Sequence, residues 1–227
     1  GFTSYSTARL RDQLGGWSEA GISRVKMKVG RNAQVDIERV MAARDTIGPD
    51  VELFVDANGA YDRKQALAQA RHFADSDVTW FEEPVSSDDI EGLRFIRDQG
   101  PDGMSIAAGE YGYQLLDFRR LLEAGAVDVL QADASRCGGI TGFLRAGALC
   151  EAFGLPFSAH CAPALHYQAA CVPTTLRHIE YFYDHVRIED MLFEGAPRPV
   201  NGSLHPDLSR PGLGLEFKRA DAKRYAV

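Results

Sequence analysis

The stretch Val78-Thr79-Trp80-Phe81-Glu82-Glu83-Pro84 places two aromatic residues directly before two adjacent glutamates, and a proline closes it. β-branched and aromatic residues favour a strand, and proline cannot donate the amide hydrogen that a strand ladder needs. The stretch therefore predicts a strand that ends at the glutamates. Because adjacent strand residues point to opposite faces, only one of the two carboxylates can face a given site.

Stretches of the same kind recur along the chain, separated by longer segments with apolar residues at helical spacing. The other predicted strands are "SRVKMKVG" from Ser23, "VELFVDAN" from Val51, "MSIAAGE" from Met104, "VDVLQAD" from Val127, "LPFSAH" from Leu155 and "RHIEYF" from Arg177. The predicted helices cover residues 7–21, 35–48, 63–76, 89–100, 115–125 and 140–154. This alternation predicts an α/β fold with a parallel sheet and crossover helices.

Both an open doubly wound sheet and a closed barrel fit this alternation. With "FTSY" at residues 2–5 as a short first strand, the strand count reaches eight, which favours a TIM-like barrel. The chain has no Gly-rich phosphate loop after an early strand, which weakens a nucleotide-binding alternative. We expect one catalytic barrel over residues 1–217 and a C-terminal tail over residues 218–227. Residues 201–217, rich in Pro and Gly, predict irregular structure with a short strand.

The composition excludes several classes of protein. The net charge of −7 over 227 residues argues against a broad basic surface for nucleic acid. No apolar run is long enough to span a bilayer, and no signal peptide is visible, so we expect no membrane partner. The four cysteines form no CxxC pair, which predicts mostly buried, reduced thiols and a cytoplasmic location.

Ionisable residues end nearly every predicted strand. They are Lys26, Lys28, Asp56, Glu82, Glu110, Asp133, His160, His178 and Glu180. In a parallel barrel the carboxyl ends of all strands lie at one face, where barrel enzymes hold their active sites. The pattern therefore predicts one site built from residues far apart in the sequence.

The types of residue indicate the chemistry. Asp56, Glu82 and Glu110 would repel one another without a cation, and three oxygen ligands suit Mg²⁺. A substrate carboxylate bound to that ion would be helped to become an enediolate. Together with the lysines and the histidine, this set is suited to abstracting a proton α to a carboxylate.

Two pairs of residues supply candidate bases. Lys26 and Lys28 are two positions apart and point to the same face of their strand, and a neighbouring cation lowers the pKa of a lysine. Asp133 and His160 end consecutive strands, and a carboxylate bonded to an imidazole fixes its tautomer and favours its charged form.

The motifs "VKMKVG", "VDAN", "FEEP", "AAGE", "QADASRCGGITG", "SAH" and "HIE" follow one another in the order seen in the enolase superfamily. The chain resembles the mandelate racemase subgroup of that superfamily from Phe2 to about Phe217. The resemblance implies a (β/α)7β barrel that follows an α+β capping domain. Because the chain starts at the barrel, we expect the N-terminal capping domain to be absent from it.

The resemblance also implies a role for each motif residue. It makes Asp56, Glu82 and Glu110 the Mg²⁺ ligands and leaves Glu83 in a supporting or loop position. Lys28 resembles the base on one face of the substrate, tuned by Lys26, and the Asp133–His160 dyad resembles the one on the other face. The further residues implied or suggested to contact substrate are Glu180, Asn58, Arg136, Tyr111 and His185.

Alternatives stay open for several residues. Arg136 stands where relatives often carry lysine, as an anion contact or a solvated residue. Tyr111 lines the pocket or is an ordinary loop tyrosine. His185 and Arg187 reach distal hydroxyls or a distal acid group of the substrate, or form a loop ion pair with Asp184 or Glu189. His166 and Tyr167 fit packing or supporting roles better than direct ones.

Three functions remain open from the sequence. The first is dehydration of an acid sugar to a 2-keto-3-deoxy acid, which the polar candidates near the mouth favour. The second is racemisation or epimerisation of a 2-hydroxy acid by the same two bases. The third is a catalytically silent barrel fragment that binds Mg²⁺. The expected partner is a small carboxylate, and the resemblance implies a homo-oligomer.

Overall fold

The computed structural model describes residues 1–226. The helices are α1 (Thr7–Glu19), α2 (Ala33–Ile47), α3 (Arg63–Ala74), α4 (Ile90–Gln99), α5 (Leu115–Glu123), α6 (Gly139–Phe153), α7 (Pro163–His166), α8 (Tyr183–Leu192) and α9 (Arg219–Ala222). The strands are β1 (Arg24–Lys28), β2 (Glu52–Asp56), β3 (Val78–Glu82), β4 (Ser105–Ala108), β5 (Val129–Ala132), β6 (Phe157–Ala159), β7 (Leu176–Ile179), β8 (Phe193–Glu194) and β9 (Glu216–Phe217). The chain divides into two compact units, residues 1–108 with 120–129, and residues 109–119 with 130–227.

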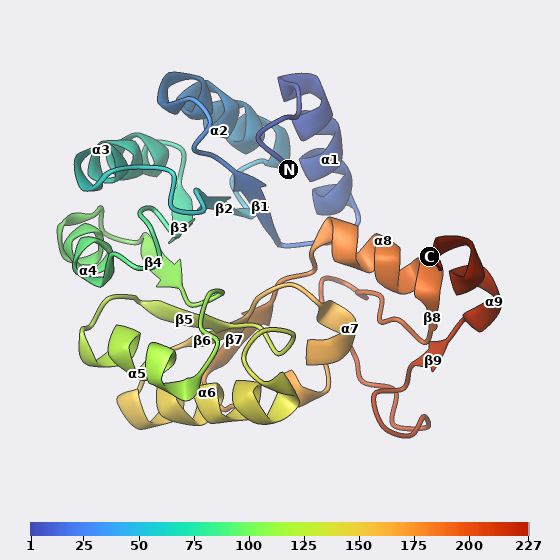
Figure 1. Cartoon of the computed structure of the whole chain (residues 1–227). Coiled ribbons are helices and arrows are strands. Elements are labelled where there is room, and N and C mark those ends of the chain that lie inside the picture. Colours follow the sequence, from blue (N-terminus) through green and yellow to red (C-terminus); the bar gives the residue numbers. More distant parts are fainter. Residues whose placement is uncertain (227) are drawn as a thin grey trace. The chain divides into compact units, whose positions relative to one another are not determined.

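The first unit is built on parallel strands β1 to β4, each paired with the next (Figure 1). Phe54 of β2 and Trp80 of β3 stack with ring centroids 5.2 Å apart. Strand residues two apart share a face, so Asp56 and Glu82 follow these rings on the same face. The two aromatic rings therefore form an apolar layer next to the first group of charged residues, on the same face of the strands.

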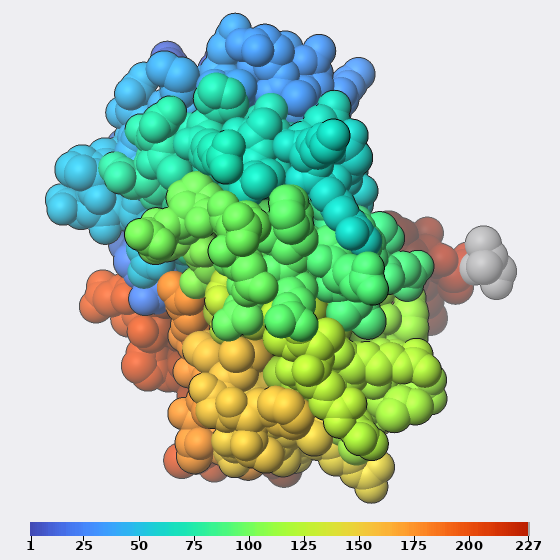
Figure 2. Space-filling model, turned by 90° about the vertical axis from the view of Figure 1, so that its left-hand side faces the viewer, coloured from blue at the N-terminus to red at the C-terminus, as the bar shows by residue number. Residues whose placement is uncertain are grey.

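Helices cover the other face of these strands. Phe81 of β3 packs edge-to-face on Phe73 of α3 at 5.6 Å, so its side chain points opposite to those of Trp80 and Glu82. In Figure 2, the side chains of α3 and α4 close over this part of the unit. With helices on one face and packed side chains on the other, β2 and β3 are almost continuously buried, as parallel strands usually are.

The second unit pairs β5, β6 and β7 in parallel and places α6 against them. Phe143 of α6 packs on Phe157 of β6, with centroids 4.9 Å apart. Towards the C-terminus, β8 and β9 form a short antiparallel pair. The irregular segment with one short strand, predicted for residues 201–217, is confirmed by β9.

The parallel α/β class, the strands predicted at the other stretches and the six predicted helices are confirmed. The prediction that residues 2–5 form a first strand is wrong, because the amide of Tyr5 donates to the carbonyl of Phe2 in a turn. The rings of these two residues pack edge-to-face at 5.5 Å, which stabilises that turn. The division at residue 217 into barrel and tail stays a prediction. Among residues 1–226, no helix combines the length and apolarity that crossing a membrane requires.

Candidate active-site residues

In the first unit, four charged residues form one cluster on the face above Phe54 and Trp80. The strand register aligns Lys28 with Asp56, and Asp56 with Glu82. The ammonium of Lys26 donates to both Glu82 oxygens, at 2.7 and 2.6 Å, and Lys28 donates to Asp56 Oδ2. Both carboxylates are fully buried, so their negative charges are stabilised by these two cations and by nearby N–H donors and not by water.

The indole of Trp80 donates to Glu82 Oε2 at 3.0 Å, and the backbone amide of Asn58 donates to Asp56 Oδ1 at 2.8 Å. Asn58 has φ 44° and Glu83 has φ 40°, both in the left-handed region that non-glycine residues rarely adopt. Such strain persists where surrounding structure enforces it. β3 ends at Glu82, as predicted, and Glu83 is buried in the turn that follows.

The expected lowering of the Lys28 pKa is wrong for this structure. Burial and the Lys26 charge lower the pKa of Lys28, but the Asp56 and Glu82 carboxylates outweigh them and raise it above the ordinary value. The expectation rested on the neighbouring cation Lys26, whereas the closer anion Asp56 dominates in the folded chain. The contact with Asp56 therefore favours the ammonium form of Lys28.

In the second unit, His160 is the centre of a second charged cluster. It follows β6 and is nearly fully buried. Its Nδ1 lies 2.9 Å from Asp133 Oδ2, and its Nε2 lies 3.2 Å from Glu110 Oε2 and 3.8 Å from Glu180 Oε2. Burial alone would lower the pKa of His160, but its hydrogen bonds, chiefly to Asp133, raise it well above the usual value. Three carboxylates thus surround His160 and favour its imidazolium form.

Asp133 is oriented from both sides. Its Oδ1 accepts from the amide of Ser135 at 2.8 Å and from the Ser135 hydroxyl at 2.6 Å, and its Oδ2 faces His160. Burial opposes its charge, but these hydrogen bonds lower the pKa of Asp133 to about 2. The expectation that the carboxylate favours the charged form of His160 is confirmed in direction.

The pair predicts a defined pH window for stability. The Asp133 contribution is present above its ordinary pKa of 3.8 and is lost as pH falls towards about 2. The His160 contribution is full below its ordinary pKa of 6.5 and is lost as pH rises through the raised value. Asp133→Asn should therefore cost about 1.5–3 kcal/mol near pH 5. Urea unfolding with EDTA present, from pH 2 to pH 9, should show the wild-type advantage shrinking below pH 4 and beginning to fall above pH 6.5; a pH-independent difference would contradict the ion pair.

Glu110 is positioned by a glycine and an arginine. Gly109 has φ 133°, and a Cβ there would overlap the carbonyl oxygen of Gln131, so only glycine fits. Arg136 Nη1 donates to the Glu110 carbonyl at 3.0 Å and to its Oε1 at 3.2 Å, and its guanidinium lies 5.2 Å from the Tyr111 ring centre. Arg136 therefore contacts Glu110 while its side chain stays 32% exposed, and its contact with a substrate anion stays a prediction.

Two other histidines of this unit contact backbone groups. His166 accepts from the Ala134 amide at 2.8 Å through Nε2 and contacts the Cys161 carbonyl at 2.9 Å through Nδ1. Burial lowers the pKa of His166, which fits a neutral ring that joins two loops. His185 accepts from the Ala162 amide at 3.0 Å. The supporting role predicted for His166 is confirmed, and the substrate contact proposed for His185 stays a prediction.

Residues 9–222 match the family described as "Enolase C-terminal domain-like". The chain belongs to this family. A crystal structure of a mandelate racemase/muconate lactonizing enzyme-like protein from Rubrobacter xylanophilus is 58% identical and superposes with a TM-score of 0.97 over 100% of this chain and 63% of that one. The family assignment made from the ordered motifs is confirmed.

Relatives of known activity are more distant. The 3,6-anhydro-alpha-L-galactonate cycloisomerase of Streptomyces coelicolor is 34% identical over 93% of this chain and 58% of its own. L-Talarate dehydratase from Polaromonas, crystallised with Mg and L-glucarate, is 34% identical with a TM-score of 0.87, over 96% of this chain and 59% of its own. The chain thus spans a little over half the length of such relatives, and the family includes dehydratases and cycloisomerases.

The first cluster of this family member has the donor chemistry that Mg²⁺ requires. Asp56 and Glu82 offer carboxylate oxygens alone, lie side by side in register and are fully buried. Lysine ammonium groups contact their oxygens here, which shows that the carboxylates are arranged around positive charge. Asp56 and Glu82 therefore fit the ion.

Three contributors to these clusters were not predicted from the sequence. Trp80 is expected only as a strand residue, yet its indole N–H donates to Glu82. Ser135 anchors Asp133, and the motif Asp-x-Ser at a strand end could have signalled it. Cys161 was read as a buried thiol, yet its Sγ lies 3.2 Å from His160 Nε2. All four cysteines are free thiols; Cys137, Cys150 and Cys161 are buried and Cys171 is exposed, so the prediction of mostly buried thiols is confirmed.

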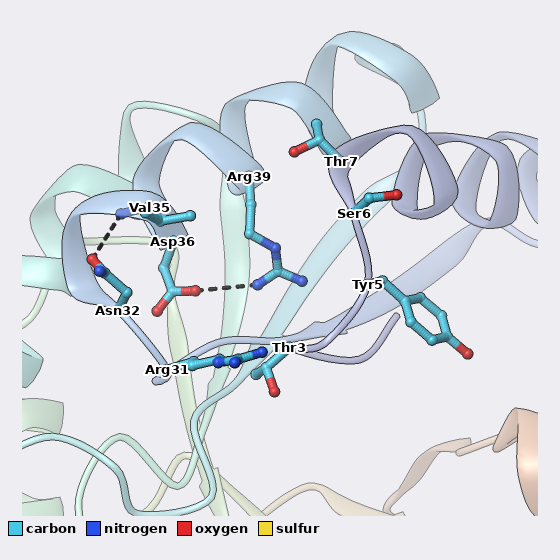
Figure 3. A pocket seen from close by; sticks show the side chains of 9 residues that line it. All are labelled: Thr3, Tyr5, Ser6, Thr7, Arg31, Asn32, Val35, Asp36 and Arg39. Atoms are coloured by element: carbon cyan, nitrogen blue, oxygen red, sulfur yellow. Dashed lines mark hydrogen bonds and ion pairs between the residues drawn. The ribbon is translucent and has the colours of Figure 1, made fainter.

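The first unit also has a hollow of about 420 Å³, drawn in Figure 3. Its lining consists of Thr3, Tyr5, Ser6, Thr7, Arg31, Asn32, Val35, Asp36 and Arg39. Asp36 and Arg39 point toward each other across its wall, 3.1 Å apart, and Arg39 also donates to the carbonyls of Lys28 and Phe2. This buried pair ties the N-terminal turn to the end of β1.

Asp36→Ala should destabilise the protein by about 3–5 kcal/mol, because it leaves the buried guanidinium of Arg39 without its counter-ion. It also removes the acceptor of the Gly30 amide and of the Tyr61 hydroxyl. Urea denaturation with an unchanged m-value would measure this loss. Asp45→Ala, at an exposed position of the same helix, is the control and should be nearly neutral; equal effects would contradict the role of the pair.

Proposed function

We propose that the chain is the catalytic domain of a Mg²⁺-dependent enzyme that removes the proton α to the carboxylate of an acid sugar and expels the β-hydroxyl. The observation that carries the proposal is His160, oriented by Asp133 and placed among carboxylates that favour its charged form. A charged imidazole can donate a proton to a leaving hydroxyl, which is the step that separates dehydration from simple proton exchange. The dehydratase relative crystallised with Mg and L-glucarate supports the same chemistry.

The proposed metal ligands are Asp56, Glu82 and Glu110. The charged cluster of the first unit supports Asp56 and Glu82 as ligands. The order of the family motifs supports Glu110. When bound, Mg²⁺ supplies a Lewis acid that stabilises the negative charge developing on the substrate carboxylate.

The protein residues then divide the proton transfers. Lys28, once deprotonated, takes the α-proton, and Lys26 holds positive charge beside it. His160 gives its proton to the β-hydroxyl, which leaves as water, and the resulting enol becomes a 2-keto-3-deoxy acid. Glu180, in its protonated form, donates a hydrogen bond to the substrate carboxylate or its enediolate.

The proposal also includes the substrate contacts and the assembly of the protein. Asn58, Arg136, Tyr111 and His185 are the proposed substrate contacts, and Arg136 is the cation among them. We also propose closure of the parallel strands into the (β/α)7β barrel of the family, a homo-oligomeric assembly and a cytoplasmic location.

The test is incubation of the full-length protein with a panel of aldonic and aldaric acids in Mg²⁺, with an EDTA control. Formation of a 2-keto-3-deoxy acid supports the proposal. Exchange of the α-hydrogen for deuterium from D₂O without elimination supports racemisation instead. Conversion of a lactone or anhydro sugar acid would indicate cycloisomerisation, as in the Streptomyces relative. The proposal fails if no acid of the panel is dehydrated.

A further inference from the structure

Three different metal-binding atoms converge in the second unit beside the proposed proton donor. His160 Nε2 lies 3.2 Å from Cys161 Sγ, and Cys161 Sγ lies 3.3 Å from Glu180 Oε2. The third side of this triangle, from His160 Nε2 to Glu180 Oε2, measures 3.8 Å. A nitrogen, a sulfur and a carboxylate oxygen thus occupy three corners around a common point.

We propose that His160, Cys161 and Glu180 form a binding site for a thiophilic divalent ion of the Zn²⁺ class, distinct in its ligands from the Mg²⁺ site. Zinc bonds to sulfur at about 2.3 Å and to nitrogen and oxygen at about 2.0–2.1 Å, which at tetrahedral angles separates donor atoms by about 3.4–3.6 Å. The observed separations of 3.2, 3.3 and 3.8 Å differ from these by a few tenths of an ångström. Small side-chain adjustments would therefore complete the geometry.

The surroundings of His160 match those of a metal-bound histidine. A ligating imidazole usually donates its other ring N–H to a carboxylate, which fixes its orientation. Here Asp133 accepts from Nδ1 at 2.9 Å, so Nε2 is the nitrogen directed at the sulfur and at Glu180. The ion would replace the proton that His160 Nε2 now shares with Glu110 and its other neighbours.

The backbone explains why adjacent residues supply two ligands to one ion. Neighbouring residues of a regular strand point to opposite faces, but β6 ends at Ala159, and Cys161 has φ 50° and Ala162 φ 39°. This left-handed turn brings the Cys161 side chain back against His160. The Cys161 amide donates to Glu180 Oε2 at 3.0 Å, which holds the third ligand in place.

The ligand types separate the two metals. A thiolate and an imidazole favour Zn²⁺ over Mg²⁺, which prefers oxygen ligands. Occupancy would remove His160 from proton transfer, so Zn²⁺ should inhibit turnover even at saturating Mg²⁺. This inhibitory part rests on the proposed function, whereas metal binding at the three residues does not.

The experiment uses Co²⁺ as a spectroscopic probe on the reduced full-length protein with excess Mg²⁺ present. Cobalt bound to a thiolate absorbs in the near-ultraviolet through sulfur-to-metal charge transfer, which an all-oxygen site cannot produce. We expect this band in the wild type and its displacement by Zn²⁺. Cys161→Ser should abolish it, Glu180→Gln should weaken the cobalt affinity at least tenfold, and the exposed-thiol control Cys171→Ser should retain it.

The results distinguish the two proposals. If the wild type gives no band, or if Cys161→Ser retains it with unchanged affinity, the metal-site proposal is overturned whether or not the enzyme is active. If the band depends on Cys161 but no substrate is turned over, the site stands and the proposed function fails. In an active enzyme, inhibition by Zn²⁺ that disappears on chelation supports the inhibitory part of the proposal. Full activity with the site occupied by Zn²⁺ contradicts it.

Discussion

His160→Asn is expected to lower the rate of acid-sugar dehydration by roughly 10²–10⁴-fold. Asparagine can still hydrogen-bond to Asp133 but cannot carry the proton that the β-hydroxyl needs on leaving. The loss should lie in kcat, with KM changed only a few-fold, because the substrate contacts proposed for other residues remain. Steady-state kinetics with the preferred acid sugar measure both constants.

The same variant separates the roles of the two proposed bases. If Lys28 removes the α-proton, His160→Asn should still exchange the α-hydrogen with D₂O while dehydration is lost. His72→Asn, at an exposed position of α3, is the matched control and should behave as wild type. Undiminished dehydration by His160→Asn would rule out His160 as the proton donor.

Glu82→Gln is expected to abolish Mg²⁺-dependent turnover, with a loss of at least about 10³-fold. The substitution keeps the side-chain size and an oxygen for the Trp80 indole, but it removes the anion that Lys26 and the metal both require. A Lewis acid contributes several kcal/mol to stabilising the transition state, so its loss should dominate the rate. Isothermal titration with Mg²⁺ and activity after EDTA treatment and Mg²⁺ return measure the effect.

Glu83→Gln is the control that the sequence itself supplies. Glu83 is the adjacent glutamate, equally buried, but it follows the end of β3 in a left-handed conformation and has no proposed metal bond. Its variant should keep Mg²⁺ affinity within a few-fold of wild type. The assignment of the metal to the first glutamate would be reversed if Glu83→Gln lost Mg²⁺ binding and Glu82→Gln retained it.

Much of the local structure was accessible from the sequence. Alternation of β-branched runs with helical periods predicted the strands and the first six helices. The face of each strand residue was also predictable, because alternation is a local rule: Trp80 and Glu82 share a face, and Phe81 packs on Phe73 behind them. The prediction failed at residues 2–5, where a contact between Phe2 and Tyr5 favours a turn over a strand.

The distances between the charged groups, and therefore the directions of their pKa shifts, could not be predicted from the sequence. The sequence showed Lys26 two positions from Lys28 and so suggested a lowered lysine pKa. The parallel register places Asp56 directly beside Lys28, and the anion reverses the direction of the shift. A pKa depends on every charge within a few ångströms, and cross-strand register sets those distances.

By itself, the sequence determined the α/β alternation, the family and the kinds of residue at the strand ends. Propensity, spacing and motif order are local properties that do not depend on contacts between distant segments. Only the tertiary structure decided which groups pair: Lys28 with Asp56, Asp133 with His160, and Arg136 with Glu110. It also decided that Cys161 turns back onto His160, since two consecutive left-handed residues override strand alternation. Pairing and turn geometry depend on contacts between distant segments, and those contacts form only when the chain folds.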